Sequence, residues 1–210
     1  SLYEYVRQLN HPVSEKLLRG WLRALLHGLV HMHEVLGLVH RDLKPKNILV
    51  KPGRRPNVCI ADFNSVIRHG EKSRSLRGES PTTLNFRSPE ALLEGDDNSY
   101  ATDIWALGCI ACTCASSDWF TFKPNDTGSG FGSLMSIFSV LGKPTAAEHP
   151  SLCALPAFKS SFPNFQRKSE VIAFVPRLSH GFNVFVNQLL QLEPTKRPTA
   201  KQALKHKYMT

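Results

Sequence analysis

The segment from Thr102 to Cys114 is apolar almost throughout and carries one charged side chain, Asp103. A helix that is apolar on every side has to be covered by other elements, so this segment predicts a helix at the centre of a domain. The chain has 210 residues, 41% of them hydrophobic and 20% charged. A chain of this length and composition can form one globular domain around such a helix.

Apolar residues at helical spacing predict further helices. The longest covers about residues 17–32, after the start signals Pro12 and Ser14 and before the stop signal Gly37. Others are expected at 131–141, at about 182–192 and at about 199–206. The stretch 142–178 contains five prolines and is expected to be irregular.

Two short apolar runs, 48–50 and 58–61, flank a polar turn at Pro52-Gly53 and predict a β-hairpin. The polar, serine-rich stretch from Arg68 to Pro81 is expected to be a long loop. The predicted fold class is therefore mainly α (α+β), a helical bundle with one small β-hairpin.

Cys109, Cys112 and Cys114 lie close together within the apolar segment. Their spacing superficially resembles a metal site, but no second Cys or His pair follows at zinc-ligand spacing. In a buried helix a free cysteine acts as a small hydrophobic residue. We therefore interpret these cysteines as reduced core residues of an intracellular protein, in the cytoplasm or the nucleus.

The segment His40-Arg41-Asp42-Leu43-Lys44-Pro45-Lys46-Asn47, which leads into the predicted hairpin, carries the chemistry. It places a carboxylate, an ammonium and an amide at offsets of two and five residues. Phosphoryl transfer to a hydroxyl needs one group that orients the hydroxyl and accepts its proton, one that spreads negative charge and one that holds a metal. The second hairpin strand ends at Asp62, which can complete a magnesium site with Asn47.

These motifs resemble the C-terminal lobe of eukaryotic protein kinases over essentially all of residues 1–210. The resemblance implies ATP and magnesium as cofactors, Asp42 as catalytic base and Lys44 as the ammonium near the transferred phosphoryl. It further implies Asn47 and Asp62 as metal ligands and Leu49 below the adenine ring. Lys44 two residues after Asp42 is the serine/threonine-kinase form.

Further residues match the family's structural motifs. Glu90, in Ser88-Pro89-Glu90, would close an activation segment over residues 62–90 and pair with Arg197. A buried carboxylate far from its partner in sequence needs a guanidinium, because burying it unpaired is costly. Asp103 would accept hydrogen bonds from the catalytic-loop backbone.

Thr83 to Glu90 resembles the corresponding segment of the cyclin-dependent, mitogen-activated and glycogen-synthase kinase group. Within that group Thr83 would bridge Asp42 and Lys44, and Arg87 would favour proline after the phosphoacceptor. Residues 137–145 resemble the helix before the group's insert, which would cover residues 142–178.

Two features depart from the family pattern. The glycine-rich loop, strand lysine and helix glutamate of an N-terminal lobe are not present, so we expect about a hundred preceding residues to be absent and this fragment alone to be inactive. Asn64 stands where the family has glycine after Asp62-Phe63. Asn tolerates the left-handed conformation expected there, so we predict that Asp62 can still be placed.

Activation by phosphorylation of the loop is a further hypothesis, because Arg41 is the family's phosphate-binding arginine. The candidate positions are Ser75, Ser80 and Thr82. Counting back from Thr83 places the position of a cyclin-dependent kinase's activating threonine at Gly78, so the count does not select one of the three.

The sequence thus predicts a serine/threonine protein kinase that acts on protein substrates, with a cyclin-like or other regulatory protein as a further partner. The rival is a non-catalytic pseudokinase or scaffold, against which the intact Asp42, Lys44, Asn47 and Asp62 argue. The net charge of +9 is consistent with a phosphate-handling site and is not concentrated as a nucleic-acid footprint would be. Neither nucleic acid nor membrane is expected as a partner.

Overall fold

A computed structural model of the chain describes residues 1–9, 11–51, 53–54, 56–71, 84–95, 98–116, 122, 129–166 and 178–210. The helices of these residues are α1 (Leu2–Gln8), α2 (Glu15–Val30), α4 (Pro89–Leu92), α5 (Tyr100–Ala115), α6 (Gly130–Leu141), α7 (Pro150–Cys153), α8 (His180–Leu189) and α9 (Ala200–Leu204). The strands are β1 (Leu38–Val39), β2 (Ile48–Lys51), β3 (Asn57–Ile60) and β4 (Ile67–Arg68). The mainly helical fold class is confirmed.

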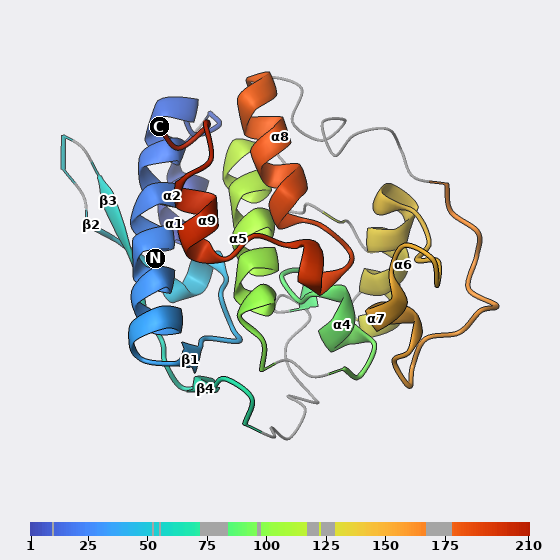
Figure 1. The fold of residues 1–210 in the computed structure, drawn as a ribbon. Helices are drawn as coiled ribbons and strands as arrows, with labels where there is room; N and C mark the ends of the chain where they lie inside the picture. The colour runs from blue at the N-terminus through green and yellow to red at the C-terminus, as the bar shows by residue number, and fades with distance from the viewer. Residues whose placement is uncertain are drawn as a thin grey trace.

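The helix α5 lies in the middle of the fold. In Figure 1, α2 and α8 flank it, while α6 and α7 lie further out beyond α8. Every residue of α5 from Thr102 to Ala115 is buried, as its composition predicted. Gly108 lets α8 approach closely, because a Cβ added there would lie 2.8 Å from Leu190 Cδ2.

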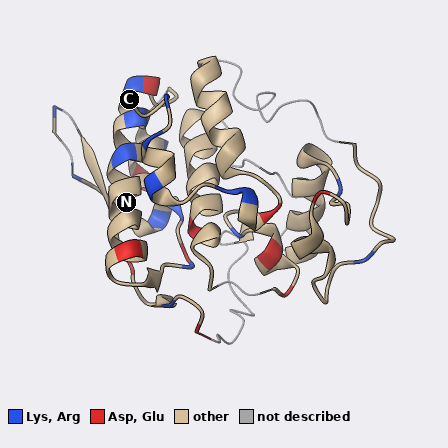
Figure 2. Cartoon of the chain, viewed as in Figure 1, with Lys and Arg blue, Asp and Glu red and all other residues tan. Residues whose placement is uncertain are grey.

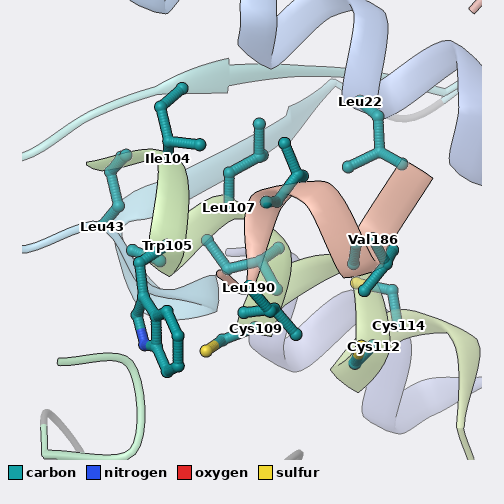
Figure 3. Packing of buried hydrophobic residues seen from close by; sticks show 14 of the residues in the cluster. Leu22, Leu43, Ile104, Trp105, Leu107, Cys109, Cys112, Cys114, Val186 and Leu190 are labelled. Atoms are coloured by element: carbon teal, nitrogen blue, oxygen red, sulfur yellow. The ribbon is translucent and has the colours of Figure 1, made fainter. Parts of the chain in front are cut away.

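The cysteines of α5 are part of this core. Figure 3 shows Cys109, Cys112 and Cys114 among apolar side chains that include Val186 and Leu190. All three are buried, and none forms a disulfide with another described cysteine. Burial raises the pKa of the Cys109 thiol well above its ordinary value and that of the Cys114 thiol to about 12. The prediction that they serve as core residues is confirmed.

The helix α2 begins at its predicted start, because the Ser14 side chain accepts a hydrogen bond from the Leu17 amide. It continues into a π-helical turn, His31–Val35, and the chain then reverses at Gly37 with a φ of 67°. A left-handed φ is the conformation that glycine adopts without steric cost. The helices predicted at 131–141 and 182–192 are confirmed within three residues as α6 and α8, and the helix predicted at 199–206 is confirmed as the shorter α9.

The predicted hairpin is confirmed as β2 and β3, which pair antiparallel with Ile48 opposite Ile60. One further sheet was not predicted. A second two-stranded sheet joins β1 to β4, with Leu38 opposite Arg68, so Arg68 belongs to a strand rather than to a loop. The pairing joins segments that are distant in sequence, and neither two-residue strand has a local pattern.

Three short helices were not predicted. These are α1, α4 and α7, and the last two each begin with a proline at the first helical position. Proline is compatible with that position because its missing N–H would have no helical partner there. Otherwise the described part of 142–178, residues 142–166 and 178, is irregular as expected.

Charged residues are distributed unevenly over the elements. Figure 2 shows them to be sparse on α5 and α8 and frequent around α2 and the C-terminal segment. Two cations of α2 contact that segment: the Arg19 guanidinium lies 4.8 Å from the centre of the Tyr208 ring, and Arg23 Nη1 donates to the carbonyl oxygen of Met209. Among the helices of the described residues, none is long and apolar enough to cross a membrane.

Candidate active site

The segment His40–Asn47 lies between two pieces of β structure. It starts directly after β1, which pairs with β4, and it ends in a short 3-10 turn, Pro45–Asn47, that continues into β2. Both ends of the loop are therefore held by strand pairing. Leu43 and Pro45 are buried and anchor its middle.

Asp103 of α5 holds the backbone of the loop. This fully buried carboxylate accepts hydrogen bonds of 2.9 Å from the backbone amides of His40, to Oδ2, and Arg41, to Oδ1. The contact from Asp103 to the loop backbone is thus confirmed. Arg41 has a φ of 68°, a conformation that costs free energy in a non-glycine residue and needs such support.

Asp42, Lys44 and Asn47 come together as one cluster. Lys44 Nζ lies 2.6 Å from Asp42 Oδ2, and Asn47 Nδ2 donates to the same oxygen at 2.9 Å and to the Asp42 carbonyl at 2.8 Å. The other carboxylate oxygen, Asp42 Oδ1, is buried and accepts no hydrogen bond from any described residue. Buried carboxylate oxygens are normally hydrogen-bonded, so Oδ1 is available for an incoming donor.

Asn47 and Asp62 lie at adjacent ends of the β2–β3 hairpin. The amide of Ala61 donates to the Asn47 carbonyl at 2.9 Å, which extends the strand pairing by one step and brings Asp62 next to that end. Asp62 is exposed and has a φ of 63°.

The conformation at Asn64 differs from the sequence-based expectation. Among the described residues other than glycine, positive φ occurs only at Arg41, Asp62 and Glu94. The left-handed residue of this turn is therefore Asp62, and the expectation of a left-handed Asn64 was wrong. Instead, Asn64 Nδ2 donates a 2.8 Å hydrogen bond to Asp62 Oδ1.

Two apolar side chains near these polar groups are exposed. Leu49 on β2 is 50% exposed and Phe63 is 57% exposed. The Phe63 ring packs at a tilt against the ring of His40, with centroids 5.6 Å apart. Leu49 thus offers free apolar surface on the strand that follows Asn47.

Arg197 and Glu90 form the predicted pair, which is bidentate with distances of 2.6 and 2.8 Å. The guanidinium also lies 4.9 Å from the centre of the Trp105 ring. Its remaining N–H groups donate to the carbonyl oxygens of Ala101, Gln191 and Leu192. Because all five guanidinium donors are used, the pair is fully compensated despite its burial.

Some predicted residues fall outside the described part of the chain. Thr83 is one, and the candidate phosphorylation positions Ser75, Ser80 and Thr82 are others. Their roles stay predictions.

Sequence reasoning missed two histidines that support the site. His33 Nε2, on the π-helical turn, lies 2.9 Å from Asp103 Oδ2 and adds a third contact to this carboxylate. No local signal could have found it, since the two residues are 70 positions apart. The His40 ring accepts from the Asp42 amide at Nδ1 and therefore donates through Nε2 to the Ala61 carbonyl, which connects the loop to the strand before Asp62.

A second missed feature is a stack of three rings. Tyr100 at the start of α5 lies between His33 and His69, with ring centroids 4.4 and 4.1 Å away. His69 follows β4, and its amide donates to the Gly37 carbonyl. The stack connects the segment after β4 to the residues that hold Asp103.

The donor set fits a magnesium ion that is shared with phosphate groups. The Asn47 amide nitrogen is used by Asp42, which leaves its oxygen as the group that can bind a cation. Asp62 supplies an exposed carboxylate. Magnesium is usually bound through one or two such protein oxygens together with substrate phosphates.

The whole of this arrangement matches a known family. The family model described as the protein kinase domain matches residues 1–209. The chain belongs to the protein kinase family, and its general function is that of a kinase, a phosphotransferase.

Proposed function

We propose that this chain supplies the catalytic loop of a serine/threonine protein kinase, which transfers the γ-phosphoryl group of ATP to a Ser or Thr hydroxyl of a protein. The observation that carries the proposal concerns the two carboxylate oxygens of Asp42. Lys44 and Asn47 hold one of them, and the other is buried without a donor among the described residues.

In this proposal Asp42 Oδ1 accepts a hydrogen bond from the substrate hydroxyl and takes up its proton as the oxygen attacks phosphorus. The contacts to Oδ2 keep the carboxylate from rotating, so Oδ1 stays directed at the hydroxyl. Lys44 stabilises negative charge that develops on the transferred group. Its ammonium lies close enough to Asp42 to act on the same reacting centre.

Asn47 and Asp62 would hold the magnesium ion, and the exposed side chain of Leu49 would contact the adenine ring. Bound ATP and magnesium supply the phosphoryl group and neutralise negative charge on the phosphates. The chain's own part is to fix Asp42, Lys44, Asn47 and Asp62 on one rigid hairpin and loop.

The preference for Ser or Thr rests on Lys44 at the second position after Asp42, and the preference for a following proline rests on Arg87 before Glu90. Thr83 is proposed to bridge Asp42 and Lys44. A cyclin-like or other regulatory protein is proposed as a partner on the same resemblance.

The test is a phosphotransfer assay on the full-length protein with pools of Ser-Pro and Thr-Pro peptides, matched Ser-Ala and Thr-Ala pools, and a Tyr pool. Replacing Asp42 with Ala should lower kcat by roughly 10²–10⁴-fold, because the proton acceptor is lost. Lys46→Ala is the matched control, since Lys46 is an exposed lysine of the same loop that faces the Tyr3 ring and not Asp42. It should change kcat less than about threefold, the scale of one weak surface contact.

Activity that survives Asp42→Ala would contradict the role given to this carboxylate. A wild-type protein that binds ATP and magnesium without turnover would favour the scaffold. Equal activity on the Tyr pool would contradict the Ser/Thr assignment alone.

A further inference from the structure

Asn64 contacts the proposed metal ligand directly. Its Nδ2 lies 2.8 Å from Asp62 Oδ1, and its backbone amide lies 3.5 Å from the same oxygen. Glycine, the residue that the resemblance places here, has no side-chain donor. This chain therefore adds a hydrogen bond to Asp62 that the family pattern lacks.

The two oxygens of Asp62 are used differently. Both donors from Asn64 go to Oδ1, whereas Oδ2 accepts no hydrogen bond within the described part of the chain. A hydrogen bond from an amide to an ionised carboxylate is charge-assisted and stronger than one between neutral groups. It fixes the rotation of the carboxylate and leaves Oδ2 as the free oxygen.

The backbone around Asp62 makes such a restraint useful. Asp62 is left-handed at a φ of 63°, which is unfavourable for a residue with a Cβ. Asp62 is also exposed, so its side chain has little packing to hold it. The local bonds from Asn64 are the only hydrogen bonds that restrain this carboxylate among the described residues.

We propose that Asn64 is a positioning residue for the metal: it holds Oδ1 of Asp62 so that the cation binds through Oδ2 as a single-oxygen ligand. Because the carboxylate is already oriented, less conformational freedom is lost when the cation binds. This inference rests on the proposed role of Asp62 as a metal ligand.

Asn64 could instead compete with the cation for Asp62, and its removal would then change the metal affinity in the opposite direction. If the Asn64 amide competed with the cation for Oδ1, removing it would free a second oxygen and strengthen metal binding. The sign of the change in metal affinity therefore separates positioning from competition.

The experiment measures binding of Mn²⁺, a magnesium substitute visible by electron paramagnetic resonance, to the full-length protein saturated with a non-hydrolysable ATP analogue. Groups that orient metal ligands typically contribute 10–100-fold to metal affinity, so Asn64→Ala should weaken Mn²⁺ binding by about tenfold, the low end for an exposed site. Affinity for the nucleotide in the presence of EDTA should stay unchanged, which a general structural defect would not allow. Asn57→Ala is the matched control, because Asn57 is an exposed asparagine whose side chain, among the described residues, accepts a hydrogen bond only from the amide of its neighbour Val58.

Unchanged or tighter Mn²⁺ binding in Asn64→Ala would overturn the inference. The Asp62→Ala variant tests the metal ligand separately from Asn64. If it abolishes Mn²⁺ binding while Asn64→Ala does not weaken it, only the role of Asn64 fails. If Asp62→Ala leaves Mn²⁺ binding intact, the proposed metal ligand itself fails, and Asn64 with it.

Discussion

Replacing Asp103 with Asn should destabilise the protein and misplace its catalytic loop. The wild-type carboxylate is fully buried and uses both oxygens, Oδ1 for the Arg41 amide and Oδ2 for the His40 amide and His33. Asparagine has nearly the same size but only one accepting atom. Whichever way the amide is turned, its NH₂ group faces an N–H donor that has lost its acceptor.

The magnitude follows from these contacts. A hydrogen bond to a charged group contributes about 1.5–3 kcal/mol, and a buried donor left unpaired costs about 1–3 kcal/mol. With one backbone N–H left unpaired, we expect the free energy of unfolding to fall by about 3 kcal/mol. The loop backbone directly before Asp42 is the part released, so kcat should fall by about 100-fold, as expected for a displacement of the order of 1 Å.

The assay is urea denaturation followed by tryptophan fluorescence, combined with the phosphotransfer assay. Thr102→Val is the matched control on the preceding residue of α5, because no described residue forms a hydrogen bond with the buried Thr102 hydroxyl. It should change the free energy of unfolding by less than about 1 kcal/mol. If Asp103→Asn behaves like Thr102→Val in both assays, then Asp103 does not hold the loop in the way described.

Two further predictions concern stability. Gly108→Ala should lower the free energy of unfolding by about 1–3 kcal/mol, because the added Cβ would lie 2.8 Å from Leu190 Cδ2. Gly20→Ala should raise the free energy of unfolding by about 0.5–1 kcal/mol, because no atom lies within 4 Å of the added Cβ. Urea denaturation measures both, and equal effects would contradict the packing of α5 against α8. Burial, assisted by the charge of Glu15, raises the pKa of Tyr208 from 10.0 to about 12, so the folded state favours the neutral phenol. This stabilisation is complete below pH 10 and is lost as the pH rises toward about 12. The free energy of unfolding should therefore fall less between pH 10 and about 12 for Tyr208→Phe than for wild type. Equal falls in the two proteins would contradict the raised pKa of Tyr208.

Much of the fold could be predicted because its signals are local. The uninterrupted apolar composition of α5, the helical spacing in α2 and the turn between β2 and β3 each depend on residues close together in sequence. The cluster of Asp42, Lys44 and Asn47 was predictable for the same reason. The pair of Glu90 and Arg197 was also expected, although its partners are far apart, because a family motif contains each of them.

The features that were missed depend on partners from elsewhere in the chain. Two-residue strands such as β1 and β4 have no periodicity, and they exist because they pair with each other. The ring stack on Tyr100 and the contact from His33 to Asp103 likewise join separate segments. Asn64 was recognised as a departure from the family pattern, but its conformation was predicted wrongly, because Asp62 and not Asn64 has the left-handed φ.

The amino-acid sequence therefore specified the chemical groups of this kinase and their order, since short offsets along one loop and one hairpin suffice to bring Asp42, Lys44 and Asn47 together. Tertiary structure decided how these groups are held. Asp103 reaches the loop only after α5 is buried in the core, and there its charge needs the backbone donors of His40 and Arg41 as much as the loop needs an acceptor.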